Sequence, residues 1–309
     1  MHKIYLFGSE YHCKMVRGIL SSDNEVKFVE SIQEADLIYV IYGPGVNRKT
    51  LKYWIFTRKP FLIHWIGTDT FILDKSRSRP QLITKIHRVV SLSLMKFRNL
   101  NNSLKFLSSA PWLAKDVAEM TGIDTEYFVL TSIENENLLI PNQNRTFDFI
   151  TYIPLQNFEM YFGSVFLEIV KLNPDKQFCI VCPDLLDIKN WPYERYTNLK
   201  IQQRTNKEGF YQLLNQSKCF IRLKDGGDAI ALSVLEALAH GCKVVWNIPF
   251  DYCNFETRDS FKLNYKKYFG EFELNREAIR FVKENYNVDM WRVQFKSIIN
   301  ELLKSKKIE

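Results

Sequence analysis

One carboxylate interrupts a long apolar segment in the second half of the chain. Glu236 is the only charged residue in the range Ala229–Ala239, and an ionised carboxylate is costly to bury unless something pairs with it. The turn Gly226-Gly227-Asp228 comes just before this segment. Free backbone N–H groups and the helix dipole would favour an anion there, where the predicted helix 229–240 begins. Together these features could hold a nucleotide diphosphate, with the turn on its phosphates and Glu236 on its ribose.

Two cations and a second carboxylate flank the same glycine turn. We expect Asp228 to be the N-cap of the helix. It precedes Glu236 by eight residues, so we expect the two carboxylates about two turns apart on one side of the helix. Arg222 and Lys224 follow a predicted strand, and an Arg can fork onto a phosphate. We expect both cations to offset the charge of a bound phosphate. The alternative is a capped core helix whose Glu236 has a salt bridge or faces solvent.

Three residues in the first half of the chain could face the same chemistry. Gly8 follows the first predicted strand, at the turn into a predicted helix. His64 and Asp69 lie in the segment HWIGTDT, which begins within a predicted strand and continues past its end. The structural alternatives are a strand–helix turn for Gly8, a hydrogen-bonded core histidine for His64 and a first-turn acid for Asp69. A G-x-G-x-x-G motif is absent, so a nicotinamide dinucleotide is not expected.

Strands and helices alternate along almost the whole chain, which predicts α/β architecture with parallel sheets covered by helices. The first series of predicted strands is Lys3–Phe7, Glu25–Glu30, Leu37–Tyr42, Phe61–Ile66, Lys105–Ser108 and Tyr127–Leu130. The second series is Phe147–Ile153, Gln177–Cys182, Leu199–Gln202, Cys219–Leu223 and Val244–Trp246. The predicted helices lie near 11–21, 47–57, 80–99, 111–121, 157–172, 206–216, 229–240 and 288–304.

The polar segment 134–146 is typical of a linker. We therefore expect a first domain at 1–144, a second domain at 145–285 and a terminal helical segment at 286–309. In two doubly wound sheets of this kind a ligand binds at the carboxyl ends of the strands, which here would face a cleft between the domains.

The composition is that of a folded protein, with 309 residues, 46% hydrophobic residues and 25% charged residues. We expect a cytoplasmic protein because neither a signal peptide nor a run of 18 apolar residues occurs. The six cysteines are scattered, and the single C-x-x-C, at Cys179 and Cys182, lies in a predicted buried strand. We expect packing there, with redox or metal chemistry as the alternative.

The net charge of +7 is unevenly distributed. The range Val46–Phe106 holds 13 of the 42 Lys and Arg residues and only two acids, Asp69 and Asp74. Such a basic field predicts an anionic partner. Its mixture with apolar residues in 84–106 fits anionic lipid head groups at the inner face of a membrane, and a solvated helix face is the alternative. Nucleic acid is not expected, since no RNP, KH or zinc-finger pattern accompanies the charge.

The segment that begins at Asp228 resembles the E-x(7)-E signature of retaining glycosyltransferases of the GT-B fold. Asp228 stands at the first acidic position and Glu236 at the second, with Ala237-Leu-Ala-His-Gly241 and Val244-Val245 after them. Other parts are similar to segments of that family: Arg222 before Asp225-Gly226, HWIGTDT at His64–Thr70, and Ala110-Pro-Trp-Leu-Ala-Lys followed by Gly122-Ile123.

The resemblance implies two Rossmann-like domains that face a cleft, and a hexosyltransferase of glycan biosynthesis. A nucleotide-diphosphate sugar would be the donor, a glycan or a lipid-linked molecule the acceptor, and the reaction would retain the anomeric configuration. The first domain would be the acceptor side, and the second would bind the nucleotide sugar. Glu236 would bind the ribose, and Asp228 with Gly226 and Gly227 would position the sugar and the diphosphate. Gly8 would face the donor phosphates, and His64 and Asp69 would lie near the acceptor hydroxyl. The resemblance implies neither a metal nor a further cofactor, and it implies that the last helix packs back onto the first domain.

Two departures from the family pattern keep other functions open. The motif G-R-x(4)-K-G is missing, since no basic residue lies between Arg145 and Lys171, and Asp228 replaces a Glu. One alternative is therefore an inactive relative that binds a nucleotide sugar or a partner protein. The other is a basic protein that binds a membrane surface or a nucleic acid.

Overall fold

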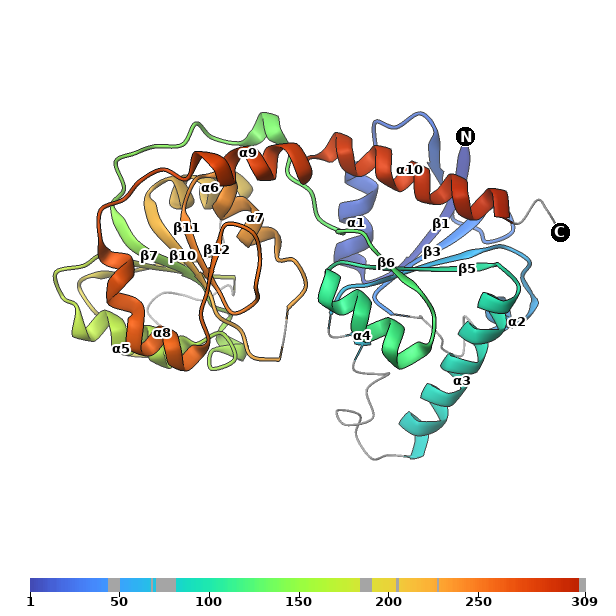
Figure 1. Cartoon of the computed structure of the whole chain (residues 1–309), viewed down its shortest axis with the longest axis horizontal. Helices are drawn as coiled ribbons and strands as arrows, with labels where there is room; N and C mark the ends of the chain where they lie inside the picture. The colour runs from blue at the N-terminus through green and yellow to red at the C-terminus, as the bar shows by residue number, and fades with distance from the viewer. Residues whose placement is uncertain are drawn as a thin grey trace. The chain divides into compact units, whose positions relative to one another are not determined.

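The chain folds into two α/β units, each built on one parallel sheet (Figure 1). Unit 1 comprises Met1–Ser132 and Val288–Glu309, and unit 2 comprises Ile133–Asn287. The chain thus leaves unit 1 once and returns to it with its last helix. The computed structural model describes residues 1–43, 51–67, 69–70, 82–183, 191–203, 206–226 and 228–305, without the side chains of 82–85, 136 and 305.

The sheet of unit 1 has the strand order β2-β1-β3-β4-β5-β6, and all its strands are parallel. β3 and β4 bury all of their residues, which is the pattern of central strands covered on both faces. The strands are β1 (His2–Gly8), β2 (Val26–Phe28), β3 (Leu37–Ile41), β4 (Phe61–Trp65), β5 (Leu104–Ser108) and β6 (Thr125–Tyr127).

Helices cover both faces of this sheet, with α1 and α10 on one side and α3 and α4 on the other (Figure 1). α10 places Trp291, Phe295 and Ile299 in the same core cluster as Tyr39 of β3. The Trp291 indole N–H also donates to the carbonyl of Val129 at 2.9 Å. The helices of unit 1 are α1 (Glu10–Ile19), α2 (Leu51–Phe56), α3 (Leu82–Leu100), α4 (Pro111–Thr121) and α10 (Val288–Ser305).

The sheet of unit 2 has the order β12-β11-β10-β7-β8-β9, again with parallel pairing throughout. Its strands are β7 (Phe147–Tyr152), β8 (Phe178–Cys182), β9 (Leu199–Gln203), β10 (Ser217–Arg222), β11 (Lys243–Trp246) and β12 (Cys253–Phe255). The fully buried thiol of Cys179 and the nearly fully buried thiol of Cys182 pack in the core of this unit.

The helices of unit 2 form two layers, with α6 and α7 on one side of the sheet and α5 and α8 on the other (Figure 1). An aromatic cluster on the second side joins Phe149 and Phe178 of the sheet to Phe166 and Phe261 of the helices. The helices are α5 (Gly163–Leu172), α6 (Lys207–Asn215), α7 (Leu232–Ala239), α8 (Arg258–Asn264) and α9 (Arg276–Asn285), with short 3₁₀ turns η2 (Asn135–Asn137), η3 (Leu155–Asn157) and η5 (Tyr265–Phe269).

The prediction of two parallel α/β sheets is confirmed, and the differences lie at the ends of elements. β12 was not predicted, because two of its three residues are exposed and the strand carries no strong apolar signal. α5 begins at Gly163, later than the expected 157, because Phe162 has a left-handed φ of 70°. The units divide at 132/133 and 287/288, whereas the sequence suggested divisions at 144/145 and 285/286.

Candidate functional site

Polar residues gather where four neighbouring strands of unit 2 end. Tyr152 is the last residue of β7 and Arg222 the last of β10, while Asn247 follows β11 and Glu256 follows β12. These strands are adjacent and parallel, so their carboxyl ends lie along one edge of the sheet. That edge is where open α/β sheets bind their ligands.

An ion-pair cluster occupies the middle of this edge. Asp228 accepts two hydrogen bonds from the nearly buried guanidinium of Arg222, and Lys224 Nζ lies 3.3 Å from its other oxygen. Arg222 also lies over the ring of Tyr161, 4.9 Å from its centroid, and within 6.0 Å of that of Tyr152. Burial alone would lower the pKa of Arg222, but Asp228 more than compensates and raises it. The two cations expected to face a phosphate are thus both paired with one carboxylate.

The prediction that Asp228 caps a helix is wrong. α7 begins at Leu232, and its N-cap is Ala231, which makes no side-chain capping bond. Asp228 therefore lies in the preceding loop, and it does not stack two turns above Glu236 on one helix. The physical reason is its bonding to Arg222, which employs the carboxylate that a cap would need. Gly226 has a left-handed φ of 84°, and Gly227 lies outside the described residues.

Glu236 lies in the middle of α7 and is 6% exposed. Burial raises the pKa of its carboxyl to about 7, although Lys207 and Tyr211 of α6 act in the opposite direction. Lys207 also pairs with Glu134 at 3.3 Å. A buried carboxyl that ionises near neutrality suits a group that accepts hydrogen bonds from a diol, since bound donors would stabilise its charged form.

A cavity of about 270 Å³ opens beside the cluster. Asn247 fixes one wall, because its side chain accepts from the backbone N–H of Lys224 at 3.2 Å and donates to the carbonyl of Lys224 at 2.9 Å. Arg258 donates to Asp225 at 2.9 Å across another wall. Asn247 thus bonds to both the N–H and the carbonyl of Lys224. The ammonium of Lys224 makes the longest hydrogen bond of the cluster, 3.3 Å to Asp228.

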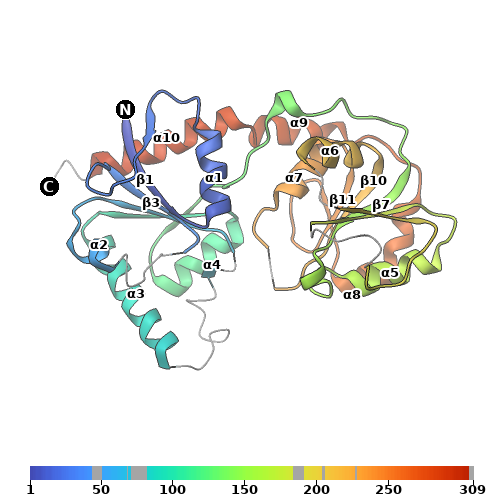
Figure 2. The ribbon, with the colours of Figure 1, turned by 180° about the vertical axis from the view of Figure 1, so that it is seen from behind.

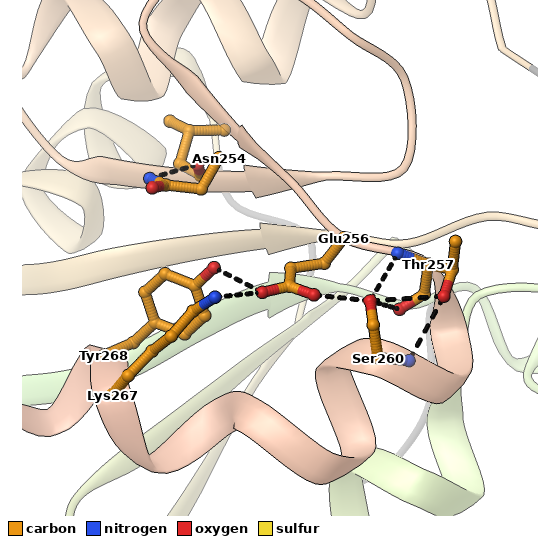
Figure 3. A network of polar contacts seen from close by, with 7 residues as sticks. Asn254, Glu256, Thr257, Ser260, Lys267 and Tyr268 are labelled. Carbon is orange, nitrogen blue, oxygen red and sulfur yellow. Dashed lines mark hydrogen bonds and ion pairs between the residues drawn. The ribbon is translucent and has the colours of Figure 1, made fainter.

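A second buried carboxylate, Glu256, connects the end of β12 to α8 and η5 (Figure 3). It follows β12, is 4% exposed, and accepts from the hydroxyl of Tyr268 at 2.9 Å as well as from Lys267 and Ser260. Burial opposes its ionisation, but these three donors outweigh burial and lower the pKa of Glu256. Figure 3 shows all three donors converging on the carboxylate from α8 and η5. The network anchors α8 beside the cavity.

In unit 1, Gly8 ends β1 with a φ of 136°. A side chain there would place its Cβ 1.7 Å from the carbonyl oxygen of Ile41. The close packing of two strands therefore accounts for this glycine, whatever else it does.

His64 is fully buried in β4, and both of its ring nitrogens are occupied. Nδ1 lies 2.8 Å from the Tyr39 hydroxyl and Nε2 lies 3.0 Å from the Ser109 hydroxyl. Burial lowers the pKa of His64 to about 3, so the ring stays neutral. The geometry matches the alternative of a hydrogen-bonded core histidine, and it leaves no ring nitrogen for an acceptor hydroxyl.

Asp69 is nearly buried, and both of its oxygens accept from the backbone N–H of Ile66 at 3.1 Å. Burial raises the pKa of Asp69 to about 6, although backbone N–H groups including those of Ile66 and Gly67 counteract part of this effect. Its contacts with the described residues include no ion pair, and its bonds are to backbone N–H groups. Asp69 instead closes the turn after β4.

Solved structures with the same pair of units identify the fold. HepE from Anabaena in complex with UDP aligns over 97% of this chain and 100% of its own, with a TM-score of 0.66 and 10% identity. A glycosyltransferase from Rickettsia africae aligns over 98% of both chains, with a TM-score of 0.62 and 10% identity. The chain has the GT-B glycosyltransferase fold.

Longer GT-B proteins match as well. The catalytic domain of starch synthase IV from Arabidopsis thaliana, bound to ADP and acarbose, aligns over 97% of this chain and 76% of its own, with a TM-score of 0.55 and 9% identity. This chain spans 57% of the length of the chain matched in the GtfA/B complex. No protein-family model and no curated protein sequence matches this chain.

Several residues of the GT-B unit 2 site were not predicted from the sequence. Tyr161, Tyr211, Lys207 and Glu256 come from a loop, from α6 and from the end of β12, far in the chain from the residues that they contact. Of these, only Glu256 had a possible signal, since it is the single acid between Cys253 and Thr257. The others form the site only through the GT-B topology.

The basic range 46–106 of this GT-B chain is described only in part, because 46–50, 68 and 71–81 lie outside the described residues. Two of its cations are already engaged: Arg98 donates to the carbonyls of Tyr53 and Trp54, and Lys105 pairs with Glu126 and Glu301. Among the described residues, no helix combines the length and the apolar character needed to cross a bilayer.

Proposed function

We propose that this chain transfers a sugar from a nucleotide-diphosphate donor to a glycan or lipid-linked acceptor. One observation carries the proposal: both units align over 97% of the chain with HepE, whose structure contains UDP and glucose. The bound ADP in starch synthase IV supports the same class of donor. The site in unit 2 supplies the chemistry that such a donor requires.

In this proposal unit 2 holds the donor. Glu236 accepts hydrogen bonds from the ribose hydroxyls, and the diphosphate binds at Gly226 and Gly227. Lys224 makes the first contact with the phosphates, because its 3.3 Å bond to Asp228 is the longest in the cluster and its stem is flexible. Arg222 is buried and doubly bonded to Asp228, so it positions Asp228 toward the sugar.

The catalytic contribution would be electrostatic. As the bond from sugar to phosphate breaks, negative charge grows on the leaving phosphate, and Lys224 with Arg222 would stabilise it. We propose retention of configuration, with the leaving phosphate accepting the proton of the acceptor hydroxyl. Gly8 and Asp69 would shape the acceptor side in unit 1, and His64 would support them from the core. The scheme uses neither a metal nor a further cofactor.

A specific observation favours a second candidate, a relative that binds a nucleotide sugar without transferring it. Asp228 engages both Arg222 and Lys224, and the basic motif after the first strand of the second domain is absent. A diphosphate must then compete with a carboxylate for the same cations. Binding would survive such competition better than transition-state stabilisation would.

Binding of UDP, GDP and ADP, measured by calorimetry, tests the donor site. Glu236→Ala should weaken nucleotide binding by about tenfold or more, since it removes the acceptor for the ribose hydroxyls. Glu208→Ala removes an exposed acid of α6 and should leave binding unchanged. Equal binding by the Glu236→Ala variant and the unaltered chain would refute the site.

Release of the nucleotide diphosphate from donor sugars distinguishes the two candidates. An active transferase should release nucleotide diphosphate from at least one donor sugar in the presence of a matching acceptor. Tight nucleotide binding with no release across acceptor panels would instead establish the inactive relative.

A further inference from the structure

The outward face of α3 is apolar, which is the reverse of an ordinary surface helix. Phe97 is 55% exposed and Leu100 is 81% exposed. Ile86, Val89 and Val90 are also exposed on the same helix. In both ribbon views the first half of α3 extends past the edge of the sheet (Figures 1 and 2).

These side chains form one stripe. At 3.6 residues per turn the five positions span an arc of roughly 100°. The residues that α3 buries are Ser91, Met95 and Arg98, and they lie on nearly the opposite side of the helix. A polar and a cationic side chain of α3 thus join Met95 in its core contacts, whereas five of its large apolar side chains face away from the unit.

α2 exposes apolar side chains of its own. The Arg98 side chain donates to the carbonyls of Tyr53 and Trp54 in α2, which fixes that helix against the last turns of α3. Ile55 and Phe56 of α2 are exposed, Phe56 by 80%. We call the exposed side chains of Ile55, Phe56, Ile86, Val89, Val90, Phe97 and Leu100 the α2–α3 patch.

The two helices that carry the patch contain charged side chains of one sign. α2 and α3 contain no acidic residue. Lys52 and Lys96 are exposed within these helices, and Arg58 is exposed just after α2. Exposed apolar side chains flanked by Lys and Arg on a helix are the combination that binds the interface of an anionic bilayer.

The charge argues against a second copy of the chain as the occupant. A two-fold contact through the patch would bring the same surface of each copy together, so the basic flanks would face each other and repel. An anionic lipid surface instead complements the flanks and accepts the apolar stripe.

We propose that the α2–α3 patch docks unit 1 on a membrane that contains anionic lipids, with the apolar stripe inserted among the head groups. The inference goes beyond the proposed glycosyl transfer and does not depend on it. If both hold, the acceptor is a molecule carried by that membrane.

Cosedimentation with vesicles tests the proposal. The full chain should bind vesicles of phosphatidylcholine mixed with phosphatidylglycerol, bind phosphatidylcholine alone far less, and release as salt rises, because salt screens the basic flanks. The double variant Phe97→Ser/Leu100→Ser should weaken binding to the mixed vesicles by about tenfold or more. Lys96→Glu should weaken it as well.

The matched control is Leu172→Ser/Leu263→Ser, which removes two exposed apolar side chains of unit 2 and should leave vesicle binding unchanged. Nucleotide binding by the patch variants reports whether the fold and the donor site survive, and Glu236→Ala should bind vesicles normally.

Absence of binding to mixed vesicles would overturn the proposal, as would equal binding by the Phe97→Ser/Leu100→Ser variant. Sedimentation without vesicles provides a further check. If the unaltered chain is a dimer that this double variant dissociates, the patch is a subunit interface and the membrane proposal falls.

Discussion

Arg222 and Asp228 are joined by two hydrogen bonds that end on a single oxygen, with Nε at 2.9 Å and Nη2 at 2.7 Å from Oδ2. The second carboxylate oxygen accepts from Lys224. One anion thus holds two cations at the carboxyl end of β10, in the place where we propose that phosphates bind. The cluster has a net charge of +1 in this arrangement, which would still attract a diphosphate.

Asp228→Asn should destabilise the protein by about 2–4 kcal/mol, because the buried guanidinium of Arg222 loses the charge that compensates it. Urea unfolding followed by circular dichroism measures the effect. Asp225→Asn is the matched control, since its ion pair with Arg258 is largely exposed and should be worth less than about 1 kcal/mol. Equal losses in both variants would mean that burial does not strengthen the Arg222 pair.

Glu236→Gln should change how stability depends on pH. The pKa of Glu236 is about 7 in the folded protein and near 4.5 in the unfolded chain. The folded protein therefore keeps this carboxyl protonated up to a higher pH. Stability should therefore fall as pH rises from about 4.5 to about 7, by an amount on the order of 2 kcal/mol. The variant should lose this slope. Urea titrations of both proteins at pH 5 and pH 8 measure the difference, and parallel pH profiles would contradict the assignment.

The same group should make nucleotide binding dependent on pH. An ionised carboxylate accepts hydrogen bonds from ribose hydroxyls better than a protonated one does, so affinity should rise as pH increases through about 7. Calorimetry with UDP across this range gives the profile. Glu236→Gln serves as the control, because the phosphate of UDP titrates identically with either protein. A rise of the same size in the variant would assign the effect to the phosphate alone.

Glu256→Gln should cost about 1–3 kcal/mol at neutral pH, since the neutral amide accepts more weakly from Lys267 and Tyr268. The pKa of Glu256 is lowered on folding. Its contribution is therefore complete above the unfolded value near 4.5 and disappears as pH falls through the folded value. Glu168→Gln is the matched control. Glu168 of α5 pairs with Lys262 of α8 in a half-exposed ion pair, and its loss should cost less than about 1 kcal/mol. The urea midpoints of Glu256→Gln and the unaltered chain should differ at pH 7 and coincide at pH 3. An equal difference at both pH values would contradict this account.

Gly8→Ala should strongly disturb unit 1, because the new Cβ would lie 1.7 Å from the carbonyl oxygen of Ile41 at a φ of 136°. Gly18→Ala meets no atom within 4 Å in helix α1 and should stabilise the protein by about 0.5–1 kcal/mol. Thermal unfolding of the two variants should move in opposite directions. Normal stability of Gly8→Ala would show that β1 and β3 can separate without cost.

Local patterns predicted the architecture because parallel sheets leave a strong mark on the sequence. Runs such as Leu37–Ile41 and Phe61–Trp65 are apolar throughout, which requires cover on both faces. The start of α7 was predicted wrongly because Asp228 pairs with Arg222 and Lys224 instead of capping the helix. Only the folded end of β10 directs those two side chains toward Asp228. The amino-acid sequence alone does not distinguish a helix-capping Asp from an ion-paired Asp in a loop.

The sequence correctly placed Glu236 on a helix and Arg222 at the end of a strand, because one local element determines each position. Contacts between distant segments were not predictable. His64 satisfies its ring through Tyr39 and Ser109, which are 25 and 45 positions away. The apolar stripe of α3 could be counted from the sequence, but the side that faces the core depends on how Arg98 meets α2.

Unit 1 contains α10, which is synthesised after the whole of unit 2. Trp291, Phe295 and Ile299 complete the core around Tyr39. During synthesis, the part of this core that α10 covers therefore stays exposed until α10 has been made. Unit 2 is continuous and has no such delay. We therefore expect the domain made first to finish folding last, and a nascent chain that stops before α10 to depend on chaperones.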